Sequence, residues 1–490
     1  MQRCATVTAP NDGRGLQVKP LVPAQRIRLS KFNTARVAPV WCSQGPKLHS
    51  GQGLSNMVRT KRLCEFASVV ALAAFGLGNS ARADGAADAS GGSWWDTVKF
   101  SGFVDAGGLG QPSRDHDSNN LNFGHLFTDK ASRVQLNQLT LTLERPIDSK
   151  KSNDVGFKFQ GMYGSDARYT HFLGELDRVT NNKEQLDIIE SWLLFHTPWL
   201  GESGTDIKVG QYVTLEGAEI IDPRGNFFYS HSYIFNFGIP FKHTGVLATT
   251  HVNSVLDVYY GIDTGVNTTF GPGRGDTNND LAFHGGFGLN LMNGDLTILA
   301  TTHIGPELPE RNALAVSHAD TRYLNDVTAI WKISKSLTST TDFNYIRDDT
   351  KVFGPNGNSS AEGYGVAQYF TYSVNDNLSL GLRGEVWRDA QGAFVGACPG
   401  NTDFVNAELG RPNGCFGSTG AGNAPKATTY YAVTLGANFK LPVDKRFEGT
   451  VIRPELRWDH ASGATPFDGG TDHDQVTIGA DVVVPLSIWH

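Results

Sequence analysis

The residues of this sequence most suited to bind ions or polar solutes are charged side chains that occur at every second position. They lie in two stretches of the C-terminal part and comprise Arg383, Glu385, Arg453, Glu455, Arg457 and Asp459. Alternate residues of an extended strand point to the same face, so each stretch would place its charges on one side of a sheet. Charges of both signs on one face can form ion pairs that support a wall, or a ladder that orients solutes along it. Both interpretations stay open.

A second group of charges opens a segment rich in aromatic side chains, residues 214–242. The charges are Glu216, Glu219, Asp222 and Arg224, and the aromatic residues are Phe227, Phe228, Tyr229, Tyr233, Phe235, Phe237 and Phe241. Because large apolar patches in water promote association, we predict that the segment folds inward, packs on an inner wall and narrows a passage. The alternative is that it caps a rim or joins a subunit interface.

Motifs of enzymatic or metal chemistry are missing from the sequence. It contains no G-x-S-x-G and no H-E-x-x-H, so we expect no catalytic residues, no cofactor and no enzymatic activity. His231, His243 and His251 lack ligand spacing, and the last two are expected to lie near strand ends. The acid-rich stretches lack the spacing of a calcium loop. We therefore expect no metal site.

The elements that position these residues are short segments in which apolar and polar side chains alternate. From Tyr431 to Leu441, one parity is apolar and the other is mainly polar. The candidate strands are residues 99–109, 133–145, 153–163, 187–197, 205–213, 243–251, 253–263, 281–291, 295–304, 321–332, 336–347, 361–373, 377–389, 428–440, 449–459 and 473–484. Most are about 9 to 13 residues long, which is enough to cross a bilayer as tilted strands.

The links between these segments are alternately short and long. Asn293-Gly294 and Asn375-Asp376 are short links with the residues that tight hairpins need, whereas residues 214–242 and 390–427 are long ones. A soluble sandwich also alternates, but it has no reason to keep this rhythm. The pattern predicts an all-β fold: a closed antiparallel transmembrane β-barrel of about sixteen strands, with short periplasmic turns, long extracellular loops and an aqueous interior.

In such a barrel the alternating charges must face the lumen. An Arg or Lys turned to lipid at the middle of the bilayer would cost roughly 2 to 4 kcal/mol. We therefore expect the ten charged residues named above to line the pore or its constriction. Tryptophan and tyrosine residues near strand ends, including Trp199, Trp387, Trp458 and Tyr212, are expected to form girdles at the headgroup level.

The N-terminal part contains a targeting signal. Basic residues after Met57 precede an apolar run from Phe66 to Leu77, and an A-x-A site follows and predicts cleavage after Ala83. Residues 1–56 are expected to be an upstream leader outside the mature protein, or alternatively an unusually long signal extension. The predicted order is leader (1–56), signal peptide (57–83), short lead (84–98) and barrel (99–490).

The net charge bears on the expected partners, and the cysteines bear on a possible disulfide. The chain has a net charge of −7, and losing its basic leader would make it more acidic. Nucleic acid is therefore not expected as a partner. We also expect the channel to prefer cations mildly over anions. Cys398 and Cys415 lie in one loop of an exported protein, which favours a local disulfide.

Three stretches of the sequence resemble a known protein family, which is more specific than the alternation and loop lengths. Residues 209–250, together with KFSGFVDAGGL (99–109) and LNQLTLTLERP (136–146), resemble the putative β-barrel porin-2 (OmpL-like) family of bacterial outer-membrane proteins. The resemblance implies an outer-membrane porin, a passive diffusion channel for small hydrophilic solutes or ions. The expected partners are outer-membrane lipid, lipopolysaccharide and those solutes. Association of three copies into a homotrimer is suggested by analogy with other sixteen-stranded porins, and the sequence itself leaves it open. The alternative is a structural or adhesive barrel with a plugged lumen.

Overall fold

The computed structural model describes residues 94–112, 121–172, 175–176, 184–267, 269, 280–307, 320–353, 359–395 and 427–489. The predicted leader, signal peptide, cleavage site and the pair Cys398 and Cys415 lie outside these residues. Within the described part, no helix is both long and apolar enough to span a membrane.

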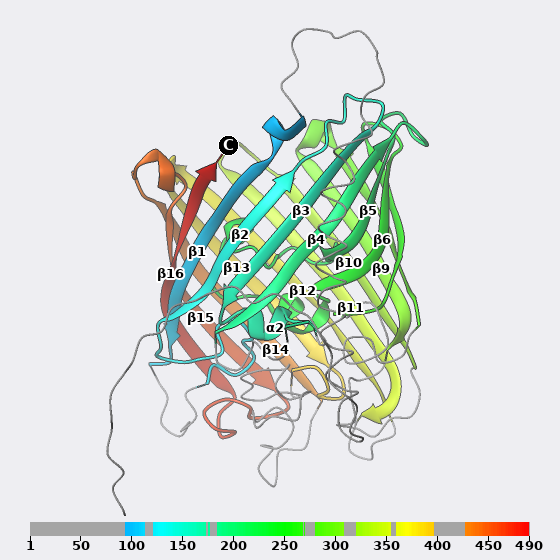
Figure 1. Cartoon of the computed structure of the whole chain (residues 1–490). Coiled ribbons are helices and arrows are strands. Elements are labelled where there is room, and N and C mark those ends of the chain that lie inside the picture. Colours follow the sequence, from blue (N-terminus) through cyan, green and yellow to red (C-terminus); the bar gives the residue numbers. More distant parts are fainter. Residues whose placement is uncertain are drawn as a thin grey trace, which may run out of the picture. The chain divides into compact units, whose positions relative to one another are not determined.

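Sixteen antiparallel strands close into one barrel, in which each strand pairs with its neighbours in the chain and β1 pairs with β16 (Figure 1). The strands are β1 (Lys99–Gly110), β2 (Gln135–Arg145), β3 (Asp154–Gly164), β4 (Gln185–Thr197), β5 (Thr205–Val213), β6 (Lys242–His251), β7 (Leu256–Asp263), β8 (Ala282–Leu291), β9 (Leu296–Glu307), β10 (Asp320–Lys332), β11 (Leu337–Phe353), β12 (Ser359–Asn375), β13 (Leu378–Asp389), β14 (Thr428–Lys440), β15 (Val451–Ser462) and β16 (Asp474–Trp489). The fold predicted from the alternation and loop rhythm is therefore confirmed.

The two faces of the wall differ as the alternation predicts. On β13, Leu380 and Leu382 point outward and are 46% and 39% exposed. The neighbouring Arg383 has the opposite parity and is fully buried on the inner side. The same outward apolar rows run along β2, β14 and β15. Closing the sheet satisfies the backbone hydrogen bonds of every strand, so an apolar outer face can lie in lipid.

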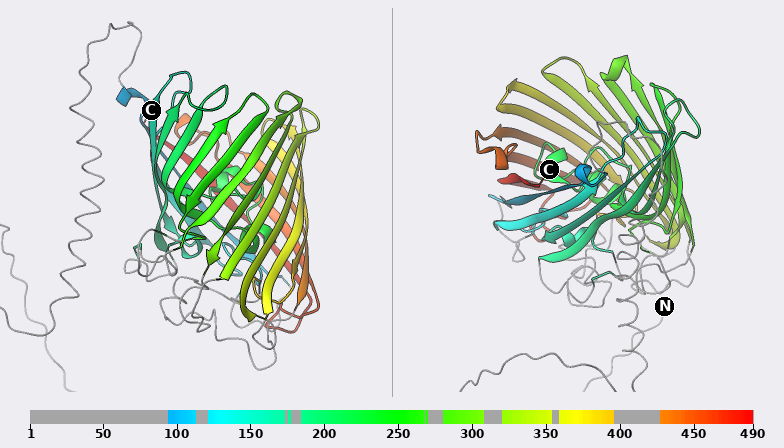
Figure 2. Two further views of the ribbon diagram at one scale, coloured as in Figure 1. Left: turned by 90° about the vertical axis from the view of Figure 1, so that its right-hand side faces the viewer. Right: turned by 45° about the horizontal axis from the view of Figure 1, so that its top comes forward.

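Short links join the strands at the end where the C-terminus lies, as both views of Figure 2 show. Between β8 and β9, Met292, Asn293 and Gly294 have φ of 54°, 58° and 91°. This left-handed backbone suits Gly and Asn, which is why the Asn-Gly pair identified the turn. The strands β11 and β12 are longer than predicted, at 17 residues each, because their pairing continues beyond the alternating apolar stretch.

Two expectations about aromatic girdles were wrong. Trp387 and Tyr212 are both fully buried inside the barrel. Trp387 has the same parity on β13 as Arg383 and Glu385 and packs in the apolar cluster of the interior. Proximity to a strand end indicates membrane depth but not which face a ring lies on. Trp199 and Trp458, at 68% and 41% exposed, remain on the outside.

Candidate functional site

The segment between β5 and β6, residues 214–241, lies inside the barrel. We call it the inserted segment. It contains a 3-10 turn, η2 (Pro223–Gly225), and a π-helical turn, η3 (Ile234–Gly238), and its η3 turn contacts β11 and β12. Phe228, Tyr233 and Phe235 are at most 2% exposed. These aromatic side chains of the segment are therefore as fully buried as those of a protein core.

Carboxylates of the wall accept hydrogen bonds from the backbone N–H groups of the inserted segment. Glu455 on β15 accepts from Tyr229 and Ser230 at 2.9 and 3.0 Å. Glu385 on β13 accepts from the N–H of Tyr233 at 2.7 Å. A segment without a strand partner must find acceptors elsewhere when it is buried, and these side chains supply them.

The same arrangement holds a second part of the segment on β10 and β11. Asp326 accepts from the N–H of Gly217 at 3.0 Å. Asp342 accepts from the N–H of Ala218 at 3.0 Å. The segment is thus bonded to two separate parts of the wall.

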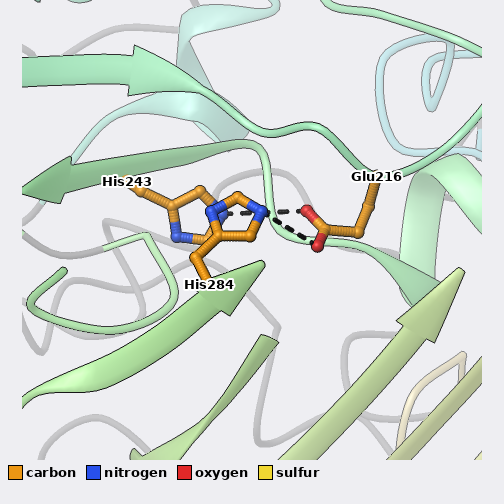
Figure 3. A group of neighbouring side chains, drawn as sticks. All are labelled: Glu216, His243 and His284. Carbon is orange, nitrogen blue, oxygen red and sulfur yellow. Dashed lines mark ion pairs between the residues drawn. The ribbon is translucent and has the colours of Figure 1, made fainter. Parts of the chain in front are cut away.

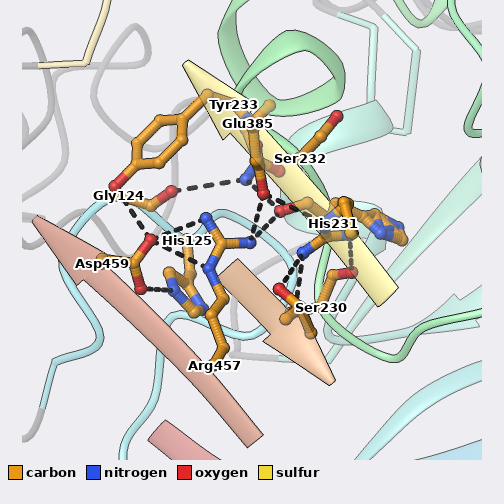
Figure 4. A network of polar contacts seen from close by, with 12 residues as sticks. Gly124, His125, Ser230, His231, Ser232, Tyr233, Glu385, Arg457 and Asp459 are labelled. Carbon is orange, nitrogen blue, oxygen red and sulfur yellow. Dashed lines mark hydrogen bonds and ion pairs between the residues drawn. The ribbon is translucent and has the colours of Figure 1, made fainter. Parts of the chain in front are cut away.

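Arginines of the wall donate to backbone carbonyls of the inserted segment. Arg453 Nη1 donates to the carbonyl oxygens of Pro223 and Asn226, both at 2.7 Å. Arg457 donates to the carbonyl of His231 at 2.6 Å (Figure 4). Charged donors make stronger hydrogen bonds than neutral ones, so these arginines fix the path of the segment.

Arg383 makes the third such contact and donates to the carbonyl of Ser230 at 2.7 Å. Its Nη1 also lies 2.7 Å from a carboxylate oxygen of Glu219, a residue of the segment itself.

Arg453 and Arg457 of β15 also form buried ion pairs with carboxylates on β13, β15 and β16. Arg457 lies 2.7 Å from Asp459 and 3.4 Å from Glu385, and Arg453 pairs with Asp481 of β16. These side chains are at most 3% exposed. Removing one partner of such a pair leaves an uncompensated charge, at a cost of about 3 to 5 kcal/mol.

Aromatic packing completes the interior. Phe127, Tyr169, Phe235 and Phe241 form one cluster with ring centroids 5.1 to 5.8 Å apart. His231 packs among them, 4.1 Å from the ring of Phe235. Burial, together with the neighbouring arginines, holds the pKa of His231 well below its usual value. The low pKa favours the neutral imidazole, which packs among the aromatic rings.

The family comparison agrees with this barrel. The model of the family described as "Putative beta-barrel porin-2, OmpL-like" matches residues 97–486. The chain belongs to this family. It is a porin of the bacterial outer membrane, as the sequence indicated.

The porin's fold is similar to those of several solved structures. They include the outer membrane channel DcaP of Acinetobacter baumannii, at 15% identity and a TM-score of 0.47, covering 79% of this chain and 97% of that chain. An anion-selective porin from Comamonas acidovorans has 10% identity and a TM-score of 0.49, with coverages of 79% and 99%. OprB of Pseudomonas putida has 12% identity and a TM-score of 0.47, with coverages of 80% and 94%. No curated protein matches the porin.

The four charges that open the inserted segment have different surroundings in the porin. Glu216 and Glu219 are 1% and 6% exposed. Asp222 and Arg224 pair with each other at 2.6 Å, with side chains 26% and 38% exposed. Only this second pair is in substantial contact with solvent. The pore-lining role predicted for all four stays a prediction.

The six strand charges are all buried on the inner side of the porin. They are Arg383, Glu385, Arg453, Glu455, Arg457 and Asp459, each at most 5% exposed. The structure brings them together as ion pairs and as anchors of the inserted segment. A further role in orienting solutes stays a prediction.

Sequence reasoning missed a cluster of histidines. His243, His284 and His303 lie on β6, β8 and β9 and are all fully buried, and Glu216 contacts two of them (Figure 3). No linear spacing could reveal the cluster, because each histidine comes from a different strand. The available signal was their position: each lies near the long-loop end of its strand, with an inward parity.

Proposed function

We propose that the inserted segment is the constriction of a passive channel that admits small hydrophilic solutes or ions. The observation that carries this proposal is the bonding of the segment to widely separated parts of the wall. Its N-terminal part is held by β10 and β11 through Asp326 and Asp342, and its middle is held by β15 through Arg453 and Glu455. A segment held in this way restricts the cross-section that solutes can use.

Partly exposed charges support a remaining aqueous path along β3, β5 and β7. Lys158 and Asp206 have inward parity, and their side chains are 22% and 19% exposed. Asp257 is 36% exposed. Arg224 and Asp222 of the inserted segment add one charge of each sign. Solutes would therefore pass charges of both signs, and size is the main selection.

A structural or adhesive barrel with a plugged lumen is the competing function. The complete burial of Arg383 and Arg457 favours it, because lumenal arginines in an open channel contact water. This alternative and the channel differ in one property, which is conductance.

Planar-bilayer recording of the purified protein tests the proposal. We expect stepwise current increases and, in a salt gradient, a reversal potential with a mild cation preference, since the chain carries a net charge of −7 and a negative field concentrates cations. An anion-selective reversal potential would contradict the predicted selectivity. Insertion without any current would favour the plugged barrel.

The partners of the outer surface remain predictions. We propose that the apolar outward rows contact outer-membrane lipid, that the long-loop end contacts lipopolysaccharide, and that the protein forms a homotrimer. Cross-linking of the detergent-solubilised protein would reveal a trimer. We also expect purified protein to lack enzymatic activity.

A further inference from the structure

We propose that Glu216, His243 and His284 bind a divalent transition-metal ion of the zinc class, which ties the inserted segment to the barrel wall. Glu216 belongs to the inserted segment, whereas His243 and His284 belong to β6 and β8. Figure 3 shows the carboxylate directed toward both imidazoles.

The donor atoms lie at the separations that a metal ion requires. One ligand atom from each residue lies within 4.8 Å of the others. His284 Nε2 is 3.1 Å from Glu216 Oε1, and His243 Nε2 is 4.0 Å from Glu216 Oε2. Bonds of about 2.0 to 2.2 Å in a tetrahedral geometry place zinc ligands roughly 3.3 Å apart, so small side-chain adjustments would close the site.

Buried polar atoms without a hydrogen bond are the second observation that points to a ligand. Both ring nitrogens of His284 and the Oε1 atom of Glu216 make no hydrogen bond of acceptable geometry within the described residues, although Nε2 and Oε1 lie 3.1 Å apart. His284 is completely buried and Glu216 is 1% exposed. Buried polar atoms are nearly always satisfied in native proteins, and a metal ion would use the lone pairs left here.

Asp263 at the end of β7 stands behind the two histidines. Its Oδ2 lies 3.4 Å from His243 Nδ1 and 3.8 Å from His284 Nδ1. A carboxylate on the far ring nitrogen is the usual support of a metal-bound histidine, because it fixes the orientation of the ring. The wall thus provides both the ligands and the group that orients them.

A second combination, His243, Asp263 and His303, also has ligand separations. It is the weaker candidate, because His303 Nε2 already bonds to Asp263 Oδ1 at 3.0 Å, whereas neither ring nitrogen of His284 makes a hydrogen bond within the described residues. In the first combination Thr214 Oγ1 donates to Glu216 Oε2 and lies 3.1 Å from His243 Nε2, so a bound ion would displace this hydroxyl. Two imidazole nitrogens with one carboxylate suit zinc and related ions. Calcium and magnesium prefer all-oxygen sites.

Metal analysis of the refolded protein tests the proposal. Because the ligands are buried, the protein is refolded in detergent with Zn²⁺, passed through a chelating column, and analysed by elemental mass spectrometry. We expect about one Zn²⁺ per chain, as a single three-ligand site would hold. Co²⁺ in place of Zn²⁺ should give the visible absorption of a four-coordinate ion.

Variants assign the ligands. Glu216→Gln and His284→Gln should each lose the bound ion, whereas Asp263→Asn should weaken affinity by about 10- to 100-fold, the usual effect of removing a supporting group. The control is His251→Gln, a partly exposed histidine paired with Asp206 and Asp257, which should keep the ion. Heat-modifiable electrophoretic mobility checks that each variant folds, and His243→Gln replaces any variant that does not.

Three results would overturn the proposal. They are wild-type protein without bound Zn²⁺, retention of the ion in both Glu216→Gln and His284→Gln, and equal loss in the His251→Gln control. Metal content is measured independently of conductance, so the channel and the metal site can fail separately.

Discussion

At the scale of single residues, the lumenal charges have two roles: they form ion pairs within the wall, and they hydrogen-bond to the backbone of the inserted segment. The alternation alone could not distinguish these roles. Their parity predicted that they face inward, and the structure places all six strand charges there. Which backbone group each one binds could not be predicted, because partners such as Arg453 and Asn226 are 227 positions apart in the chain. The same limit hid the contact between Glu216 and His284, which depends on tertiary position.

Replacing Arg457 tests the anchoring role of these charges. Arg457→Met leaves Asp459 and Glu385 without this cation and the carbonyl of His231 without its donor. We expect a loss of about 3 to 5 kcal/mol, measured as a lower temperature for loss of folded electrophoretic mobility. Arg224→Met, which breaks an exposed pair with Asp222, is the control and should change stability by about 1 kcal/mol or less. Equal effects of the two changes would refute the anchoring role.

Asp166 should make stability depend on pH. Burial raises its pKa to about 7, although hydrogen bonding from Gln138 and the nearby Arg168 oppose the shift. An acid whose pKa rises on folding binds its proton more tightly in the folded state, so stability falls as pH rises from about 4 to 7 and is level above that. At about 1.4 kcal/mol per pKa unit, the loss is on the order of 4 kcal/mol.

Thermal unfolding at pH 5 and pH 8 measures this effect. Asp166→Asn should reduce the difference between the two conditions, whereas Asp148→Asn, at an exposed turn, should leave it unchanged. Gln138 also donates to the carbonyl of Ile221, so protease cleavage of the inserted segment should follow the same pH trend. A difference that persists in Asp166→Asn would contradict this account.

At the scale of elements, the strands and hairpins followed from the sequence, whereas the path of the inserted segment did not. Periodicity and Gly/Asn links are local signals, and β5 and β14 begin and end at the predicted residues. The segment was predicted to fold inward from its aromatic content alone. Its docking points could not be predicted, because the charged side chains and the glycines of the wall that it contacts are brought opposite it only by the closed barrel.

Gly381 on β13 is one of these docking points. A Cβ atom added there would lie 2.2 Å from a ring carbon of Phe227. Gly381→Val should therefore displace this part of the segment and raise both single-channel conductance and protease cleavage. Gly384 on the same strand has nothing within 4 Å of the added atom, so Gly384→Val is a matched control expected to behave like wild type. Identical conductance in the two variants would exclude docking at Gly381.

At the scale of the whole molecule, the barrel separates two environments and the inserted segment divides the inner one. Outward apolar rows suit lipid, and closure between β1 and β16 leaves no free sheet edge. The closed architecture was predictable because one physical requirement, an apolar outside and a polar inside, acts on every strand. The histidine cluster was not predictable. It forms only when β6, β7, β8 and β9 pair in their observed register and the inserted segment places Glu216 beside them.

The most direct test of the central claim is the single-channel conductance of a protein lacking residues 225–237. This deletion removes the part of the inserted segment that holds Phe228, Tyr229 and Tyr233 but leaves the strands intact. If the segment is the constriction, the shortened protein conducts more current per channel than wild type under the same salt and voltage. An unchanged conductance in a correctly folded deletion variant would contradict the account.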